Sequence, residues 1–532
     1  MPWLSVVEEM EFKKMNRREL FKTAAAGLAM GLPAPGTGRS RAKCPSRPNL
    51  LFLITDQQRT DTLRAYGNTR NIAPNLDRLA DKSVVFKQYY VTQPLCTPSR
   101  GCLFSGLYPH TNGATANNIP IRADVPVLTQ MLQEGNYATA YYGKWHLGNE
   151  ICKQHGFDYF ESTQDENIKY VTGPCGGRKH SGYYDFLIRH GIKLKHGVSL
   201  REFSNELPKE LSKPAYLADT AEDFLAKHGQ KPWAMYVSFI DPHTPYHSVN
   251  DHLYNPSSMP VPKSFSEKPD PTELDRYKAI RQLLLRGYQE YQGMIASPET
   301  LQQVEARYWG KVTLVDEMIG RILKRLEDLG LDDKTIIVFT SDHGAMMGDH
   351  RLMFKSVMYE QAVKVPMLLR VPWLANSSLR IIRPVSEVDV TPTLLELMAQ
   401  PLPRHLQGQS WAPYLTESRE VPERDVIIEF NGPPWPFKDK YTEPLRTIRT
   451  TEGWKMTLAP QGAGLLYHLT SDPEEMTNLF YREDSLPVIH RLAARINLWQ
   501  QATGDKLIRF DEEGWQIRRE EYIRQGAVQA RS

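Results

Sequence analysis

The stretch NLLFLITDQQ, residues 49–58, joins an apolar segment of strand length directly to polar residues. Residues 49–55 form a continuous, largely apolar run, and Asp56 and Gln57 end it abruptly. Such a run is typical of a strand buried on both faces of a parallel sheet. The same pattern returns in three later stretches: NYATAYYGKWHLG (136–148), WAMYVSFIDPHTPY (233–246) and TIIVFTSDHG (335–344).

The segments between these strands carry apolar residues at helical spacing. The clearest is VTLVDEMIGRILKRLEDLG (312–330), which ends in a glycine that is a typical helix stop. Its apolar face consists of Val315, Met318, Ile319, Ile322, Leu326 and Leu329. Alternating strands and helices predict an α/β fold with a large, mostly parallel sheet sandwiched between helices. Ligands bind outside the carboxyl ends of such strands, so we expect the polar clusters to meet at one edge.

We expect three parts along the chain. Residues 1–45 are predicted to be an export signal and linker, and residues 46–410 a catalytic α/β domain. Residues 411–532 are predicted to form a smaller C-terminal α+β subdomain, with an antiparallel sheet followed by a helix near 485–502. In the first part, Arg17 and Arg18 precede a short Ala/Gly-rich segment, a pattern that resembles a twin-arginine export signal. This predicts a periplasmic or secreted protein, and a disordered basic tail is the alternative.

Composition excludes some classes of partner. A net charge of +3 over 532 residues, with no basic blocks interleaved with aromatics, does not indicate nucleic-acid binding. No apolar run reaches the roughly 20 residues that a transmembrane helix needs, so we expect no stable membrane insertion. The 5 cysteines cannot all pair within one chain, and Cys152 with Cys175 could form a disulfide.

Two of the strand ends carry candidate metal ligands. Asp56 is followed by Gln57, and Asp342 is followed by His343. Two carboxylates, an amide oxygen and an imidazole can hold one divalent cation. Either aspartate alone would more simply be a turn or helix-capping residue. Their expected position at the same sheet edge favours a metal site.

A further stretch, PLCTPSRGCLFSG (94–106), places a cysteine at a predicted helix start. We interpret Thr97 as the N-cap and Pro98 as the first helical residue, so Cys96 lies at the positive end of the helix. The anionic form of a nucleophile is favoured there. Arg100, one turn into the helix, could bind an oxyanion or hold the nucleophile. A structural cysteine is the alternative.

Basic side chains complete the candidate site. Lys144 and His146 lie two residues apart on a stretch predicted to be extended, so both can point to the same side. His243 follows another strand, and Lys355 follows the Asp342 cluster. Two lysines, two histidines and an arginine suit a site that neutralises a small, multiply charged oxyanion and protonates a leaving group.

With these motifs, the chain resembles the type I sulfatases of the alkaline-phosphatase superfamily. PLCTPSRGCLFSG is similar to the family's Cys-x-Pro-x-Arg signature, with Ser105 in place of the usual Thr. GNYATAYYGKWHLG (135–148) is similar to the second signature, and SDHG (341–344) and LYHLTSDPEEMTNL (466–479) add to the likeness. The resemblance covers roughly residues 48–500 and implies hydrolysis of a sulfuric ester.

The resemblance also implies how the site works. A formylglycine-generating enzyme would oxidise Cys96 to formylglycine, which attacks sulfur as its hydrate while coordinated to one divalent cation. Arg100 would support this nucleophile and the metal shell. Asp56, Gln57, Asp342 and His343, together with residue 96, would hold the cation. Calcium is the expected ion, and manganese is the alternative because His343 is among the ligands.

The remaining roles concern the sulfate and the leaving group. His146 would deprotonate the second hydroxyl of the hydrate, and Lys144 and Lys355 would bind sulfate oxygens. His243, with Lys355, would protonate or stabilise the leaving alcohol. Asn117 or Asn118 would also contact the sulfate, and the sequence does not decide between them.

One departure from the family opens an alternative. Many members carry two adjacent aspartates where this chain has Asp56 and Gln57, and the same Asp-Gln pair occurs in related phosphonate monoester and phosphodiester hydrolases. Those relatives lack the Lys-x-His pair that stands here as Lys144 and His146, which favours the sulfatase interpretation. An exported binding protein with an unmodified, inactive site is a further alternative, against which Cys96 and the lysines argue.

The expected substrate is a sulfated carbohydrate or a sulfated small molecule. Residues 162–215 and 248–300 interrupt the alternation and are interpreted as insertions over the site. The first is rich in basic residues, and the aromatic stretch NGPPWPFKDKY (431–441) could stack on sugar rings. The basic residues are Arg178, Lys179, His180, Arg189, Lys193 and Lys195. A solvated charged loop and a packing segment are the alternatives, and aryl sulfates and choline sulfate stay open as substrates.

Overall fold

The computed structural model describes most of the chain from residue 45 onward. The described residues are 45–70, 72–132, 135–165, 175, 177–194, 200–286, 293–374, 378–417, 422–432, 443–506, 519–521 and 523–524. The predicted export signal, Lys195 and residues 433–441 of the aromatic stretch lie outside them. The described residues belong to one compact unit, Ala42–Ser532. Among them, no helix has both the length and the apolar character needed to cross a membrane.

The large sheet is mostly parallel, as predicted. In spatial order its strands are β4 (Tyr159–Ser162), β3 (Ala138–Gly143), β5 (Trp233–Ser238), β1 (Asn49–Thr55), β6 (Thr335–Ser341), β7 (Met367–Arg370), β2 (Val84–Tyr90) and β8 (Arg380–Ser386). The run from β4 to β6 is parallel throughout. Strand β7 is antiparallel to both neighbours, and β8 is parallel to β2.

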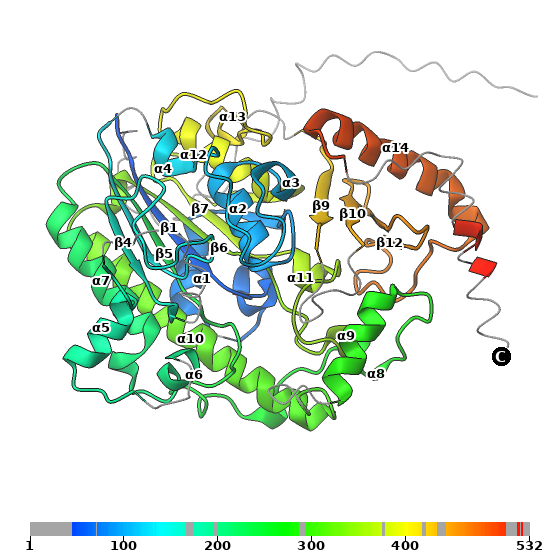
Figure 1. Ribbon diagram of the computed structural model, residues 1–532, viewed down its shortest axis with the longest axis horizontal. Helices are drawn as coiled ribbons and strands as arrows, with labels where there is room; N and C mark the ends of the chain where they lie inside the picture. Colours follow the sequence, from blue (N-terminus) through cyan, green and yellow to red (C-terminus); the bar gives the residue numbers. More distant parts are fainter. Residues whose placement is uncertain are drawn as a thin grey trace, which may run out of the picture. The chain divides into compact units, whose positions relative to one another are not determined.

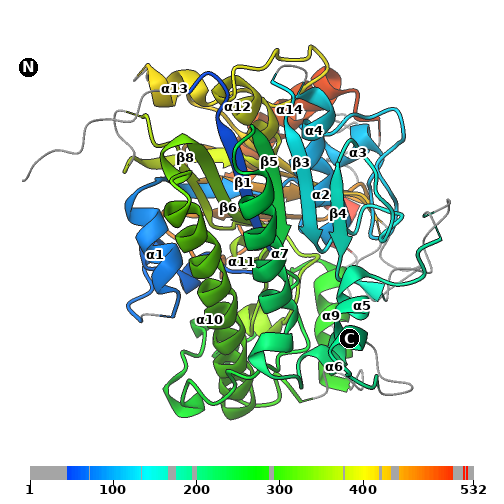
Figure 2. The same cartoon turned by 90° about the vertical axis from the view of Figure 1, so that its left-hand side faces the viewer.

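Helices cover both faces of this sheet, because successive side chains of each strand point to opposite sides. Leu51 and Leu53 of β1 pack with the apolar faces of α1 (Pro74–Asp81), α7 (Lys213–His228) and α10 (Pro298–Asp328), which lie together on one face (Figure 2). The alternate residues of β1 pack on the other face. That second core includes side chains from α2 (Cys96–Ser105), α4 (Leu128–Met131), α12 (Val390–Leu397) and α13 (Ala412–Thr416).

Helix α10 contains the amphipathic segment found in the sequence and is longer than predicted. It starts at Pro298, where the Ser297 hydroxyl accepts a hydrogen bond from Thr300 N–H. It ends at Asp328, and Gly330 has a φ of 65°, the left-handed conformation that favours glycine after a helix. Leu329, assigned to the helix from the sequence, therefore lies just beyond its last residue.

The C-terminal part contains the predicted antiparallel sheet and closing helix. Its strands, in spatial order, are β12 (Gly464–His468), β11 (Trp454–Leu458), β10 (Leu445–Arg449) and β9 (Val426–Phe430). Helix α14 (Leu486–Thr503) lies along this sheet (Figure 1) and packs Ile489, Leu492 and Ile496 into a separate apolar core. The domain boundary near residue 410 stays a prediction.

Short helices occupy the remaining segments. The two predicted insertions contain α5 (Gly182–Arg189), α6 (Leu200–Ser204), α8 (Lys263–Ser266) and α9 (Asp275–Arg286), and α3 (Pro109–Asn112) and α11 (Glu360–Val363) lie elsewhere. The Cys152–Cys175 disulfide is present.

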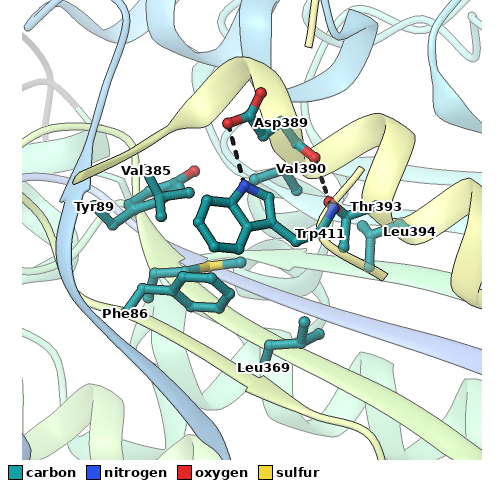
Figure 3. A pocket seen from close by; sticks show the side chains of 10 residues that line it. Phe86, Tyr89, Leu369, Val385, Asp389, Val390, Thr393, Leu394 and Trp411 are labelled. Carbon is teal, nitrogen blue, oxygen red and sulfur yellow. Dashed lines mark hydrogen bonds between the residues drawn. The ribbon is translucent and has the colours of Figure 1, made fainter. Parts of the chain in front are cut away.

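Trp411, before α13, fills the space beside β2 and β7 (Figure 3), where its indole N–H donates to Asp389 at 3.3 Å. The cavity left there measures about 10 Å³, enough for about one water molecule.

Candidate active site

The carboxyl ends of four adjacent strands bring the polar clusters of the sequence together. Strands β3, β5, β1 and β6 are neighbours, and they lead into Lys144, Asp241, Asp56 and Asp342. The backbones pack closely here: a Cβ at Gly143 would lie 1.9 Å from the Ser238 carbonyl oxygen. Glycine is therefore required where β3 ends beside β5.

Four buried side chains form a compact group of possible metal ligands. One ligand atom from each of Asp56, Cys96, Asp342 and His343 lies within 4.8 Å of the others. His343 Nε2 is 3.2 Å from Cys96 Sγ and 3.6 Å from a carboxylate oxygen of each aspartate. Among the described residues, the buried Asp56 Oδ1 has no hydrogen-bond partner. Two buried carboxylates with an unpaired oxygen are a donor set that fits one divalent cation.

Gln57 adopts a left-handed backbone conformation, with a φ of 68°. A non-glycine residue in this region is strained, and such strain is concentrated at functional sites. Its N–H is 3.4 Å from Asp342 Oδ1, and its side-chain oxygen is 3.5 Å from the Tyr246 hydroxyl. The structure therefore places Gln57 beside the ligand group, and its role as a ligand stays a prediction.

Helix α2 begins two residues earlier than predicted. Leu95 is the flanking residue, Cys96 is the first helical residue, and Thr97 is not the N-cap. The Thr97 hydroxyl instead donates to the His146 carbonyl at 2.7 Å, and its N–H donates to Asn117 Oδ1 at 3.1 Å. A side chain from another segment thus satisfies a free N–H of the first turn, so no local cap is needed.

Arg100 is fully buried and connects α2 to the strand ends. Its Nε donates to Asp342 Oδ2 at 2.8 Å, and its Nη1 donates at 2.8 Å to both the Lys144 carbonyl and the Ser238 hydroxyl. Its Nη2 lies 4.0 Å from Asp56 Oδ2. These contacts place Arg100 behind the metal-ligand group, where it orients the Asp342 carboxylate.

The sequence expectation for the segment after β3 was wrong in its geometry. The strand ends at Gly143, and His146 has a φ of 58°, so the segment is not extended. Lys144 nevertheless enters the site, where its ammonium group contacts the Asp56 carboxylate. His146 Nε2 is 3.1 Å from Asn118 Oδ1. Asn118 therefore contacts His146, whereas Asn117 caps α2, and which of the two contacts the sulfate stays a prediction.

Lys355 lies between Cys96 and His243 and contacts both. Lys355 Nζ lies 3.2 Å from Cys96 Sγ and 3.1 Å from His243 Nε2. His243 Nδ1 lies 2.8 Å from the Thr244 carbonyl and also contacts the Arg201 guanidinium, while Nε2 lies where it can accept a hydrogen bond from the Lys355 ammonium. Burial, together with the nearby Arg201 and Lys355, lowers the pKa of His243 well below its usual range.

The sequence analysis missed two cations that hold His243. Arg201 of α6 contacts both the His243 ring and the Thr244 carbonyl. Lys311 of α10, itself buried, lies 2.8 Å from Asp241 and donates at 2.9 Å to the His243 carbonyl. The available signal was the position of Lys311 four residues before Val315, on the apolar face of a helix. Arg201 gave no comparable signal, because it lies in an irregular insertion.

The electrostatics of the group favour an ionised Cys96 and Asp56. Burial and Asp56 raise the pKa of the Cys96 thiol, but Lys144, Lys355 and His343 lower it well below its usual range. Burial likewise raises the pKa of Asp56, and Lys144, His243 and Lys355 outweigh that effect and lower it. Burial and the neighbouring Asp56 raise the pKa of Asp342. A cation between the two carboxylates would allow both to ionise.

Comparison with known proteins identifies the family. The sulfatase family matches residues 48–400, and the C-terminal region of N-sulphoglucosamine sulphohydrolase matches residues 348–502. An ulvan-active sulfatase from Formosa agariphila is 26% identical, covering 90% of this chain and 85% of that protein.

Two solved structures show the same fold. One is a protein in complex with its substrate D-glucosamine-2-N,6-O-disulfate, with a TM-score of 0.71 and 23% identity over 88% of this chain and 100% of that one. The other is the phosphonate monoester hydrolase of Agrobacterium radiobacter, with a TM-score of 0.69 and 24% identity over 86% and 96%. With its family match and its site, this chain belongs to the sulfatase family of the alkaline-phosphatase superfamily.

Proposed function

We propose that this sulfatase hydrolyses its ester with a formylglycine made from Cys96 and with one divalent cation. The observation that carries the proposal is the position of Cys96 Sγ, which is 3.2 Å from both His343 Nε2 and Lys355 Nζ. A purely structural cysteine has no need of a histidine and a lysine this close to its sulfur. Formylglycine would supply hydroxyl groups at this position, and the cation would stabilise their charged form and polarise the ester.

The chain's own residues would hold the cation. Asp56 and Asp342 supply hard carboxylate oxygens, which favour calcium. Gln57 would add an amide oxygen, and His343 an imidazole that keeps manganese as the alternative. Arg100 keeps the Asp342 carboxylate oriented through the 2.8 Å hydrogen bond.

Other side chains would bind the sulfate and transfer protons. Lys144 and Lys355 neutralise sulfate oxygens beside residue 96, and Asn118 holds His146 in place for proton abstraction. His243 can receive a proton at Nε2 from Lys355 and hand it to the leaving oxygen. The low pKa keeps His243 neutral at neutral pH, so the proton that it passes to the leaving oxygen has to come from Lys355 during the reaction.

A phosphonate or phosphate diester hydrolase is the second candidate. Gln57 and the fold shared with a phosphonate monoester hydrolase favour it. The position of Lys144, whose ammonium group contacts Asp56 inside the site, favours the sulfatase. The family membership and the clustered ligands argue against an inactive binding protein.

The deciding experiment compares kcat/KM for an aryl sulfate with kcat/KM for the matching aryl phosphonate monoester. It uses protein whose Cys96 peptide carries the aldehyde by mass spectrometry. We expect a strong preference for sulfate, and loss of activity on chelation that calcium restores. A preference for the phosphonate would refute the sulfatase assignment. Full activity with an unmodified Cys96 would refute the role of formylglycine. It would also remove the need for a formylglycine-generating enzyme as a partner.

For the natural substrate we propose a sulfated carbohydrate. Relatives described as ulvan-active and as complexed with a disulfated glucosamine support this class. The basic insertion supports it less than the sequence suggested, because Arg178 forms a 2.7 Å ion pair with Glu161. Sulfate release from a panel of sulfated oligosaccharides, against choline sulfate and aryl sulfates, tests the proposal.

We also propose export, which N-terminal sequencing of protein from the native host would test.

A further inference from the structure

A buried carboxyl group contacts α2, the helix that begins at Cys96. Glu387 belongs to a single 3₁₀ turn, Glu387–Asp389, that follows β8, and its side chain is fully buried. Its Oε1 is 2.6 Å from the Ser99 hydroxyl of α2. Its Oε2 accepts two hydrogen bonds of 3.0 Å, from Thr92 N–H and from the Thr92 hydroxyl. The Ser99 hydroxyl also contacts the carbonyl oxygen of Asp342.

The hydrogen bonds of the Ser99 hydroxyl decide whether Glu387 is ionised or protonated. The Ser99 hydroxyl has one hydrogen, yet it contacts two acceptors, the Asp342 carbonyl and Glu387 Oε1. With an ionised Glu387, one of these two contacts would place two acceptor oxygens together without a proton, which is costly in a buried site. With a proton on Oε1, Glu387 donates to Ser99, and Ser99 donates to Asp342. Every contact then has one donor and one acceptor.

The surroundings of Glu387 agree with a neutral acid. Among the described residues, no lysine, arginine or histidine forms an ion pair with it. The titratable groups that face it come from β2, α2, the segment after β6 and its own turn: Tyr89, Cys102, Asp342 and Asp389, the last paired with Arg424 at 2.7 Å. All four carry either no charge or a negative one. Burial raises the pKa of Glu387 to about 8, although its hydrogen bonds with Ser99 and Thr92 oppose the shift.

We propose that Glu387 is a positioning residue that acts as a protonated carboxylic acid and holds the Asp342 backbone and α2 together through Ser99. Ser99 lies between Cys96 and Arg100 on α2, so this link fixes the nucleophile relative to a metal-ligand residue. The inference rests on the proposed function, which gives Cys96 and Asp342 these roles. Loss of the Glu387 proton at alkaline pH breaks the link and lowers activity.

The test compares Glu387→Gln with Glu387→Ala in the full-length, aldehyde-bearing enzyme. Glutamine can donate its amide N–H to Ser99 and accept from Thr92 with its carbonyl, so it reproduces the neutral acid. We expect Glu387→Gln to keep kcat/KM near that of the wild type at neutral pH, and Glu387→Ala to lower it about 10- to 100-fold. We also expect the alkaline decline of wild-type activity to move to higher pH in Glu387→Gln.

Two outcomes would overturn the proposal. One is a Glu387→Gln enzyme that folds normally and is as impaired at neutral pH as Glu387→Ala. The other is an alkaline decline that is the same in Glu387→Gln and the wild type. Ser99→Ala supplies the matched variant: because both residues act through one link, its effect and that of Glu387→Ala should not add.

A second measurement separates this inference from the proposed function. Isotope-edited infrared difference spectroscopy reports the carbonyl stretch of a protonated carboxylic acid without any turnover. We expect a band that is present in the wild type at neutral pH, absent in Glu387→Gln and lost at alkaline pH. Its absence from the wild type would refute the protonated state even in an active sulfatase. Its presence in a protein inactive toward sulfate esters would refute only the proposed function.

Discussion

Two buried clusters of charged side chains in this molecule have similar composition and different hydrogen bonding. In the C-terminal part, Arg446 of β10 binds both oxygens of Asp505, at 2.7 and 2.9 Å, and its third nitrogen donates to the Leu445 carbonyl at 2.8 Å. At the active site, buried atoms of Asp56, Arg100 and His146 have no hydrogen-bond partner among the described residues. The Arg446–Asp505 pair, here called the satisfied cluster, stabilises the fold. The unpaired atoms of the active-site cluster can instead bind a ligand.

The largest effect should come from the nucleophile. Cys96→Ala removes the reacting group, so we expect kcat to fall by about 10⁴-fold or more. The midpoint of thermal unfolding should change little, because alanine keeps the helical backbone at the start of α2 and only the sulfur atom is lost. Activity assays and thermal unfolding on the same preparation measure both. A large loss of stability would instead show that Cys96 is structural.

Removal of the proton donor should have a selective effect. In His243→Ala we expect kcat/KM for esters of poorly acidic alcohols to fall about 100-fold, since their leaving oxygen needs a proton. Activated aryl sulfates should lose much less. His247→Ala is the matched control, because His247 is exposed and pairs with Asp251 at 3.1 Å. Equal losses for both substrate classes would exclude the general-acid role.

Disruption of the satisfied cluster should affect stability alone. Arg446→Met leaves a buried Asp505 without its arginine, so we expect a loss of about 3–5 kcal/mol in the free energy of unfolding. The activity of the folded fraction should stay near that of the wild type. Arg482→Met is the control: its 3.0 Å pair with Asp484 is exposed and should contribute less than about 1 kcal/mol. Denaturant unfolding measures the free energy of unfolding of both variants. An equal loss in the two would refute the structural role of the buried pair.

The contrast also explains what could be predicted from the sequence. Apolar runs that stop at Asp56 and Asp342 indicated the strands and their shared edge, because parallel strands place their ends together. The motif around Cys96 predicted that this residue becomes the nucleophile, which stays a prediction. These signals are local: each lies within one short segment.

The residues that hold the site in place left weaker signals. Glu387 reaches Ser99 across 288 positions of the chain, and Lys311 reaches the His243 carbonyl across 68. Such contacts depend on tertiary packing. The left-handed His146 likewise follows from its surroundings, since its N–H is bound by Glu150 at 2.9 Å and its carbonyl by Thr97. Strand periodicity predicts neither these long-range contacts nor the backbone conformation of His146.

The smallest effect should appear in the pH dependence of stability. His110 is held by Glu429 at 3.0 Å, and Glu429 lies 3.6 Å from Arg446 of the satisfied cluster. Burial lowers the pKa of His110, but Glu429 and Asp505 outweigh this and raise it. A raised pKa means that the folded state binds the proton more tightly. The stability it contributes is therefore complete below the ordinary histidine pKa of about 6.5 and disappears as the pH rises through the folded-state value.

His110→Gln should accordingly flatten the decline of the free energy of unfolding between mildly acidic and alkaline pH. The same scan on His247→Ala provides the exposed control, for which we expect little change. Sulfatase activity should be unaffected at any pH, since His110 contacts Glu429 and the Thr503 carbonyl and, within the described part of the chain, forms no hydrogen bond with a residue of the active site. An unchanged pH profile of stability in His110→Gln would show that Glu429 interacts with a neutral imidazole, so that this cluster is held by hydrogen bonds rather than by charge.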